Sequence, residues 1–200
     1  MTGQIDVEII PIPFPNPPAP ATIAFFGDSN TVGYPNACLE DGVSTGTSYV
    51  AQVGGTLTVD LTKSYAHNGY TTSQVKAAAV PIPGTTAVLM LGTNDLRTGI
   101  DLRTSMQEIE RWWKNSTPDA LLVMAIPPYT GKNALVAEYN AALKVLAAKW
   151  GWEYGDPWKP FRTADGSWLP GSNVDTKHAA PAVYTVIGCK VQAKLELMTA

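Results

Sequence analysis

"AFFGDSNTVGY", residues 24–34, closes an apolar run with an acid and a hydroxyl, Asp28 and Ser29. The run begins at residue 21 as ATIAFF, and its β-branched and aromatic residues predict a buried strand. Gly27 and the polar residues that follow predict a turn where this strand ends. Ser29 is therefore either a cap of the next turn or a nucleophile, and the rest of the sequence has to distinguish the two.

Further apolar runs alternate with helix-period segments along the chain. The predicted strands that follow the first are TLTVDL (56–61), TAVLML (86–91), ALLVMAI (120–126) and the weaker WEYGD (152–156). The predicted helices cover 101–113, 133–150 and 181–198, with shorter ones at 47–53 and 72–79. Strands that alternate with helices predict right-handed βαβ units, and hence an α/β fold whose parallel sheet has helices on both faces.

The three longer helices each show one apolar face. The residues on this face are Leu102, Met106, Ile109 and Trp113 in the first helix, Leu135, Tyr139, Leu143, Leu146 and Trp150 in the second, and Val183, Ile187, Val191 and Leu195 in the third.

The size and charge of the chain restrict its class. Its 200 residues predict one domain with a real core. Fourteen basic and 17 acidic residues give a net charge of −3, which disfavours nucleic acid and anionic membrane surfaces as partners. No apolar run is long enough to span a bilayer. The N-terminus has no signal-peptide pattern, so we expect a cytoplasmic or virion-associated protein.

Residues 1–20 differ from the rest of the chain. The segment PIPFPNPPAP (11–20) holds six prolines and favours an extended polyproline II conformation. We expect a proline-rich arm over 1–20, serving either as a tether to a larger assembly or as a strap along the surface, and one domain over 21–200. Cys38 and Cys189 form no metal-binding pattern; they are expected to be free thiols, with one long-range disulfide as the alternative.

Polar groups follow each predicted strand. In a parallel sheet the carboxyl ends of the strands share one edge, where reactive groups collect. The groups delivered there are Gly27-Asp28-Ser29-Asn30, His67-Asn68-Gly69-Tyr70, Gly92-Thr93-Asn94-Asp95 and, after the last strand, Asp175-Thr176-Lys177-His178. The sequence thus predicts that a hydroxyl, an amide, a glycine, an acid and a histidine meet at this edge.

This set of groups is sufficient for acyl transfer. A serine hydroxyl needs a base within hydrogen-bond reach, and His178 can be that base for Ser29. The imidazole needs a carboxylate to orient it, and Asp175 lies only three residues away. The oxyanion of a tetrahedral intermediate needs fixed donors, which the Gly69 N–H, the Asn94 amide and the Ser29 N–H can supply.

Four short blocks, GDSN (27–30), the Asn68-Gly69 turn, GTND (92–95) and DTKH (175–178), resemble the ordered motifs of the SGNH, or GDSL-type, serine hydrolases. The resemblance covers residues 22–190. It implies Ser29 as nucleophile, His178 as base, Asp175 as its partner, and Gly69 and Asn94 as oxyanion donors. It also implies a flavodoxin-like three-layer α/β/α sandwich with a five-stranded parallel sheet in the order 2-1-3-4-5.

The sequence departs from the family pattern in three places. Asn30 stands where relatives often have an aliphatic residue, Ala179-Ala180 separate His178 from Pro181, and the block HNGYTTSQV lacks a second glycine. None of these departures removes a catalytic group.

Other residues near the motifs have competing interpretations. Asp28 and Asp95 are either paired carboxylates for a metal or a glycosidase reaction, or acceptors that hold the motif loops; we favour the second. His67 has no acid at short spacing and is interpreted as structural or pocket-lining. No cluster has metal-ligand spacing and no nucleotide motif is present, so we expect no cofactor. The candidate substrate-pocket residues are Asn30, Tyr34, Tyr70, Trp158 and Trp168, and the long loop 30–47 is expected to form one lip of the cleft. Trp158 and Trp168 either pack their loop onto the domain, which we favour, or form an aromatic platform at the pocket.

The sequence therefore predicts a serine esterase that forms an acyl-enzyme. The expected substrate is a short-chain or O-acetyl ester, either a small molecule or a glycan. The alternative is a catalytically silent glycan-binding module on the same fold, attached by the proline-rich arm to a cell-surface or phage-tail assembly.

Overall fold

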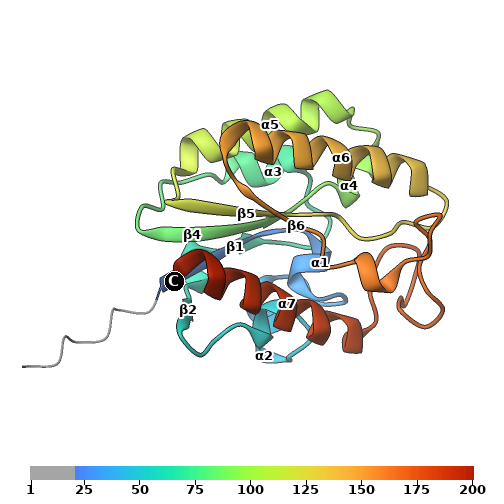
Figure 1. The fold of residues 1–200 in the computed structure, drawn as a ribbon, viewed down its shortest axis with the longest axis horizontal. Helices are drawn as coiled ribbons and strands as arrows, with labels where there is room; N and C mark the ends of the chain where they lie inside the picture. Colours follow the sequence, from blue (N-terminus) through green and yellow to red (C-terminus); the bar gives the residue numbers. More distant parts are fainter. Residues whose placement is uncertain (1–20) are drawn as a thin grey trace, which may run out of the picture.

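A computed structural model describes residues 21–200, and the arm expected over residues 1–20 lies outside the described residues. Its parallel sheet lies between two helical layers (Figure 1). The strands are β1 (Ala21–Gly27), β2 (Leu57–Val59), β3 (Tyr65–Ala66), β4 (Thr85–Met90), β5 (Ala120–Met124) and β6 (Glu153–Gly155). The strand order is β2-β1-β4-β5-β6, and the additional short strand β3 also pairs with β1. With β3 left out of the numbering, this is the predicted order 2-1-3-4-5.

Strand β1 is the centre of the sheet. It pairs with β4 over six positions, from Thr22–Thr85 to Gly27–Met90. On its other side β2 pairs with its beginning and β3 with its end, where Phe26 opposes Tyr65. Strand β3 has only two residues, too few for the alternation that reveals a strand in a sequence. Its pairing nevertheless brings the residues that follow it to the end of β1.

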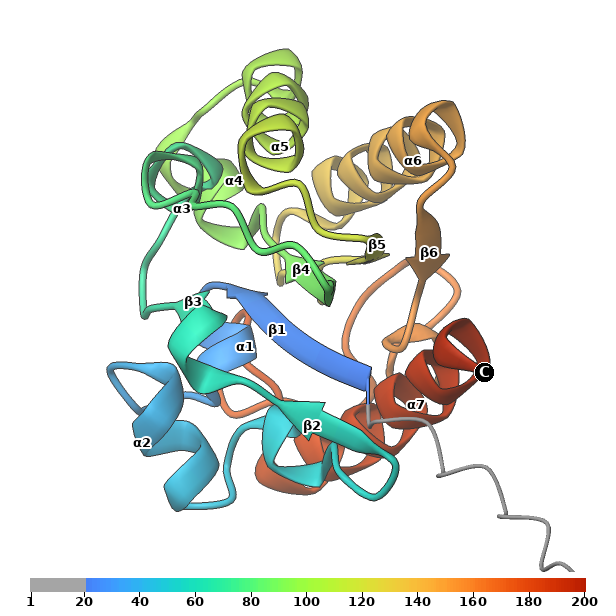
Figure 2. The same ribbon diagram turned by 90° about the vertical axis from the view of Figure 1, so that its left-hand side faces the viewer.

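The helices form two layers, as predicted. The α-helices are α1 (Ser29–Val32), α2 (Leu39–Ser44), α3 (Thr72–Ala77), α4 (Thr93–Thr98), α5 (Leu102–Ser116), α6 (Asn133–Trp150) and α7 (Pro181–Thr199); the 3-10 helices are η1 (Tyr49–Gln52), η2 (Leu61–Lys63) and η3 (Lys159–Phe161). Figure 2 shows α3, α4, α5 and α6 on one face of the sheet and α1, α2 and α7 on the other.

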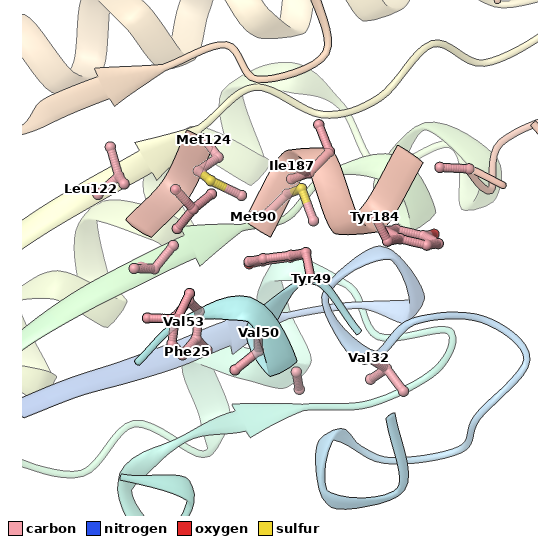
Figure 3. Packing of buried hydrophobic residues seen from close by; sticks show 14 of the residues in the cluster. Phe25, Val32, Tyr49, Val50, Val53, Met90, Leu122, Met124, Tyr184 and Ile187 are labelled. Carbon is pink, nitrogen blue, oxygen red and sulfur yellow. The ribbon is translucent and has the colours of Figure 1, made fainter. Parts of the chain in front are cut away.

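Each face of the sheet carries its own apolar core. Figure 3 shows the core under α7, where Phe25 and Met90 of the sheet lie near Tyr49 and Ile187. The four positions predicted for the α7 face are all buried. Helix α7 approaches η1 so closely that a Cβ at Gly188 would lie 2.4 Å from the Tyr49 carbonyl oxygen, which explains a glycine in the middle of this helix.

Several local expectations need correction. Leu135 of α6 is 47% exposed and Val136 is buried in its place, and Trp112 rather than Trp113 is the fully buried tryptophan of α5. The helix expected over 47–53 is the 3-10 helix η1. The stretch 30–47 is not only a loop, since it contains α2 and most of α1.

Two expectations concern the thiols and membrane insertion. Cys38 and Cys189 are both free thiols, so the disulfide alternative is wrong. Within residues 21–200, every helix is too short or too polar to cross a membrane.

Candidate active site

Ser29 is presented by a tight junction between β1 and α1. Asp28 caps α1, its side chain accepting a hydrogen bond of 2.9 Å from the Asn30 N–H. A Cβ at Gly27 would lie 1.9 Å from the Thr31 hydroxyl oxygen, so only glycine allows the first turn of α1 to pack against the strand end. The G-D-S sequence therefore places the Ser29 side chain at the carboxyl edge of the sheet.

Ser29, His178 and Asp175 form a continuous chain of hydrogen bonds. The Ser29 Oγ lies 2.8 Å from His178 Nε2, and His178 Nδ1 lies 2.6 Å from Asp175 Oδ2. The other Asp175 oxygen, Oδ1, accepts bonds of 2.8 Å from the backbone N–H groups of Lys177 and His178. The three-residue spacing thus folds into a tight turn that brings the two side chains together.

The ionisation of this chain suits base catalysis. Burial lowers the pKa of His178 below its usual value, an effect that the nearby Asp175 only partly offsets. Burial alone would raise the pKa of Asp175, but hydrogen bonds from the Lys177 N–H and from His178 lower it below its usual value. At neutral pH the imidazole is therefore neutral and able to accept a proton, while the carboxylate is charged.

Two of the three candidate oxyanion donors are backbone N–H groups, those of Ser29 and Gly69. Gly69 has a φ of +83°, and a Cβ built on it would meet nothing within 4 Å, so its surroundings are open. Among residues 21–200, no acceptor bonds the backbone N–H of Gly69 or of Ser29. Both donors are available for a bound oxygen atom.

The amide of Asn94 is held in one orientation. Arg97 Nε can only donate a hydrogen bond, and it lies 3.1 Å from Asn94 Oδ1. This contact assigns the other amide atom, Nδ2, as the donor, and Nδ2 lies 3.0 Å from the Tyr70 carbonyl oxygen. One of the two Nδ2 hydrogens is thereby left for a ligand. This arrangement could not be predicted, because Arg97 reaches Asn94 through helix α4, which no sequence pattern indicated.

Asp95 and Asp28 organise the motif loops, as interpreted. Asp95 is fully buried and accepts hydrogen bonds from the Thr72 N–H and hydroxyl and from the Ser105 hydroxyl. It thereby joins α4 to α3 and α5. Asp28 lies behind Ser29, where burial raises its pKa to about 6. In the described part of the chain, no group of three acidic, cysteine or histidine side chains could hold a metal ion.

Three of the five candidate pocket residues lie in the interior. Asn30 is fully buried, with Oδ1 accepting from the Tyr184 hydroxyl at 3.0 Å and Nδ2 donating to Asp28. Trp158 is also fully buried and donates to the Ala125 carbonyl. Trp168 is 8% exposed and donates to the Thr176 carbonyl. These hydrogen bonds give all three residues a structural part, and their contact with substrate stays a prediction.

The two tyrosines lie close to the proposed donors and base. Tyr34 is 37% exposed, and its ring stacks on the His178 imidazole. Tyr70 is partly buried, and its carbonyl accepts from Asn94. The ring of Tyr70 stacks on His67, with 4.8 Å between centroids. His67 therefore packs beside the oxyanion turn and has no contact with Ser29, which agrees with a structural or lining role.

The sheet order and the helices on both faces define a flavodoxin-like three-layer α/β/α sandwich (Figure 2), with polar groups gathered at the carboxyl edge of its sheet. A family model described as the GDSL-like lipase/acylhydrolase family matches residues 25–186. The chain belongs to this family, which places it among the ester hydrolases.

Solved structures show the same fold at low sequence identity. A G-D-S-L family protein from Desulfitobacterium hafniense DCB-2 superposes with a TM-score of 0.67 at 19% identity, covering 86% of this chain and 98% of that one. A member of the lipolytic protein G-D-S-L family from Veillonella parvula DSM 2008 has a TM-score of 0.64 at 22% identity, covering 89% of this chain and 98% of that one. A carbohydrate acetylesterase from Sinorhizobium meliloti has a TM-score of 0.62 at 16% identity, covering 88% of this chain and 99% of that one. The comparison with curated protein sequences found no match.

Proposed function

We propose that residues 21–200 form a serine esterase domain that hydrolyses a carboxylic ester through an acyl-enzyme. The observation that carries this proposal is the hydrogen-bonded chain from Ser29 through His178 to Asp175, with bonds of 2.8 and 2.6 Å. A serine that only capped a helix would need neither a buried neutral imidazole at its hydroxyl nor a carboxylate behind that imidazole.

Acylation begins with proton transfer from the Ser29 hydroxyl to His178 Nε2. The freed oxygen attacks the ester carbonyl carbon, and the carbonyl oxygen becomes negatively charged. The Ser29 and Gly69 N–H groups and the free Asn94 Nδ2–H donate to this oxyanion. Asp175 stabilises the imidazolium, which then gives its proton to the departing alcohol.

Deacylation repeats the same steps with water. His178 takes a proton from the water molecule, whose oxygen attacks the acyl carbon. The same three donors hold the second oxyanion, and His178 returns the proton to Ser29 Oγ as the carboxylic acid leaves. Because Asp28 and Asp95 already serve the motif loops, neither is needed as a proton carrier.

A fluorophosphonate tests the nucleophile directly. It should bond covalently to Ser29, and mass spectrometry of the digested protein should find the label on the peptide that contains this residue. Labelling of another residue, or no labelling at all, would contradict the proposal. Retained binding of acetylated glycans by an unlabelled protein would support the binding-module alternative instead.

Replacing Asn94 with alanine should lower kcat for an acetyl ester by about 10²- to 10³-fold, because one oxyanion donor is lost. KM should change little, since the bond strengthens only as charge develops. Asn133, which opens α6 and bonds Ser167, provides the control: Asn133→Ala should retain kcat. An Asn94→Ala enzyme with the kcat of the wild type would remove Asn94 from the oxyanion site.

We propose a short acyl group, most simply acetyl, carried on a carbohydrate or a small alcohol. The enclosure of the site supports a small acyl group, since Ser29 is 1% and His178 3% exposed. The carbohydrate acetylesterase of the same fold supports an O-acetyl sugar.

The acyl preference should appear with p-nitrophenyl esters of increasing chain length. We expect kcat/KM to be highest for acetyl or propionyl and at least about tenfold lower for decanoyl, because the burial of Ser29 and His178 leaves little room for a long chain. The same series measured with an O-acetylated sugar should show acetate release. A preference for decanoyl would overturn the short-chain assignment without affecting the assignment of Ser29.

A further inference from the structure

The two edges and one face of the His178 ring are all in contact with other groups. Its two nitrogens bond Ser29 and Asp175 in the plane of the ring. One face of the ring is covered by Tyr34, with 4.1 Å between the centroids and only 4° between the planes. His178 is 3% exposed, whereas Tyr34 itself is 37% exposed. Tyr34 therefore lies between the imidazole and solvent.

We propose that Tyr34 is a positioning residue for the base: its ring holds the plane of the His178 imidazole and keeps bulk water from that face. The inference rests on the proposed function, in which His178 exchanges protons with Ser29. It assigns to Tyr34 a role separate from the substrate contact expected from the sequence.

The end of α1 holds the backbone of Tyr34 in a defined position relative to Ser29. Gly33 ends this helix with a φ of +83°, and its N–H donates to the Ser29 carbonyl at 3.0 Å. A Cβ at Gly33 would lie 2.5 Å from the backbone of Thr47 and Ser48, so the turn requires glycine. Asn36 Nδ2 also donates to the Gly33 carbonyl. The turn that presents Ser29 therefore also sets the position of the Tyr34 ring.

The segment that begins at Tyr34 also reaches the oxyanion turn. The Ala37 carbonyl accepts a hydrogen bond of 3.0 Å from the Asn68 N–H, next to Gly69. Cys38 and His67 form an antiparallel bridge immediately beyond it. Residues 34–38 thus contact both the base and the turn that carries an oxyanion donor.

The stack controls a degree of freedom that the two hydrogen bonds leave open. The two hydrogen bonds of an imidazole fix the positions of its nitrogens. They resist only weakly a rotation of the ring plane about the line that joins those nitrogens. A flat ring at 4.1 Å blocks tilting toward its side, so Nε2 stays aimed at Ser29 Oγ. Geometric errors of this kind are costly, because proton transfer needs hydrogen-bond alignment.

The cover also affects the protonation of His178. Burial is the main cause that lowers the pKa of His178. The charged groups of its own segment are Asp175, which raises that pKa, and Lys177, which lowers it. From other elements the ring meets only the neutral Ser29 hydroxyl and the Tyr34 phenol among the described contacts. Removing Tyr34 should therefore let water stabilise the imidazolium and raise the pKa.

The test compares Tyr34→Ala with Tyr34→Phe, which retains the flat ring. We expect Tyr34→Ala to lower kcat for p-nitrophenyl acetate by about 10- to 100-fold with KM within about threefold, and Tyr34→Phe to stay within about threefold of the wild type. Should Tyr34→Ala fail to fold, Tyr34→Leu, which has apolar bulk but no flat face, carries the same expectation.

A second measurement is independent of turnover. The chain has only two histidines, so proton NMR can follow His178 and His67 separately. The pKa of His178 should rise toward its ordinary value in Tyr34→Ala and remain unchanged in Tyr34→Phe. Equal kcat and equal His178 pKa in the two variants would overturn the proposal, as would a change confined to KM. Failure of the esterase assignment would instead appear as a wild-type rate in Ser29→Ala, whatever the histidine titration shows.

Discussion

Replacing Ser29 with alanine is expected to lower kcat/KM for p-nitrophenyl acetate by about 10⁴-fold or more. The substitution removes the attacking oxygen, and the oxyanion donors can then assist only a direct attack by water. Rates of acetate and p-nitrophenol release by the purified proteins measure the effect. The fold should survive, because the hydroxyl makes one side-chain hydrogen bond and its loss costs about 1 kcal/mol of unfolding free energy.

Ser44 provides the matched control for Ser29. It ends α2 at the surface, and its hydroxyl bonds only the Asp41 carbonyl. Ser44→Ala should therefore have the rate of the wild type. Equal rates for Ser29→Ala and Ser44→Ala, with both proteins folded, would reject Ser29 as the nucleophile and the acyl-enzyme with it.

The sheet and the convergence of the motifs were predictable from the sequence, because both follow from buried strands that alternate with helices. Continuous apolar runs such as 120–126 occur where a strand is covered on both faces. Alternation of such runs with helices leaves few topologies, and parallel strands bring their polar ends to one edge. Ser29, Asn94 and His178 could therefore be expected together before any coordinates were known, although they lie up to 149 residues apart.

Short elements were not predictable in the same way. Helices α1 and α4 have four and six residues, fewer than two turns, so no hydrophobic period can develop. Because α4 could not be predicted, the group that orients the Asn94 amide could not be predicted either. The Arg97 contact that orients the Asn94 amide depends on the i,i+3 spacing within α4.

Burial near the motifs also depends on packing that the sequence does not display. Asn30 was a pocket candidate because it directly follows Ser29 along the chain. In the fold, Asn30 points to Tyr184 of α7, a contact across 154 residues. In α6, neighbouring positions differ by about 100° around the axis. A rotation of the helix by that angle buries Val136 and leaves Leu135 exposed.

The wild-type rate should fall on acidification with a midpoint below the ordinary histidine value. The base must be neutral to accept the Ser29 proton, so activity is lost as the pH falls through the pKa of His178. Burial lowers that pKa, which moves the loss to lower pH than for an exposed histidine. A pH profile of kcat/KM for an acetyl ester should show this limb.

Replacing His178 with alanine should lower kcat/KM by about 10⁴-fold, since Ser29 is left without a base. The acidic limb of the pH profile should disappear with it. Labelling of Ser29 by a fluorophosphonate should slow in parallel. The only other histidine is the control: His67 packs on Tyr65 and Tyr70 and bonds neither Ser29 nor Asp175. His67→Gln should keep its rate within about threefold and retain the acidic limb, because it leaves the proton path intact. If His67→Gln lost activity as severely as His178→Ala, the base would have to be reassigned. If the acidic limb survived in His178→Ala, it would have to come from another titrating group. Buried Asp28, with a pKa of about 6, is the one nearest to Ser29 in the sequence.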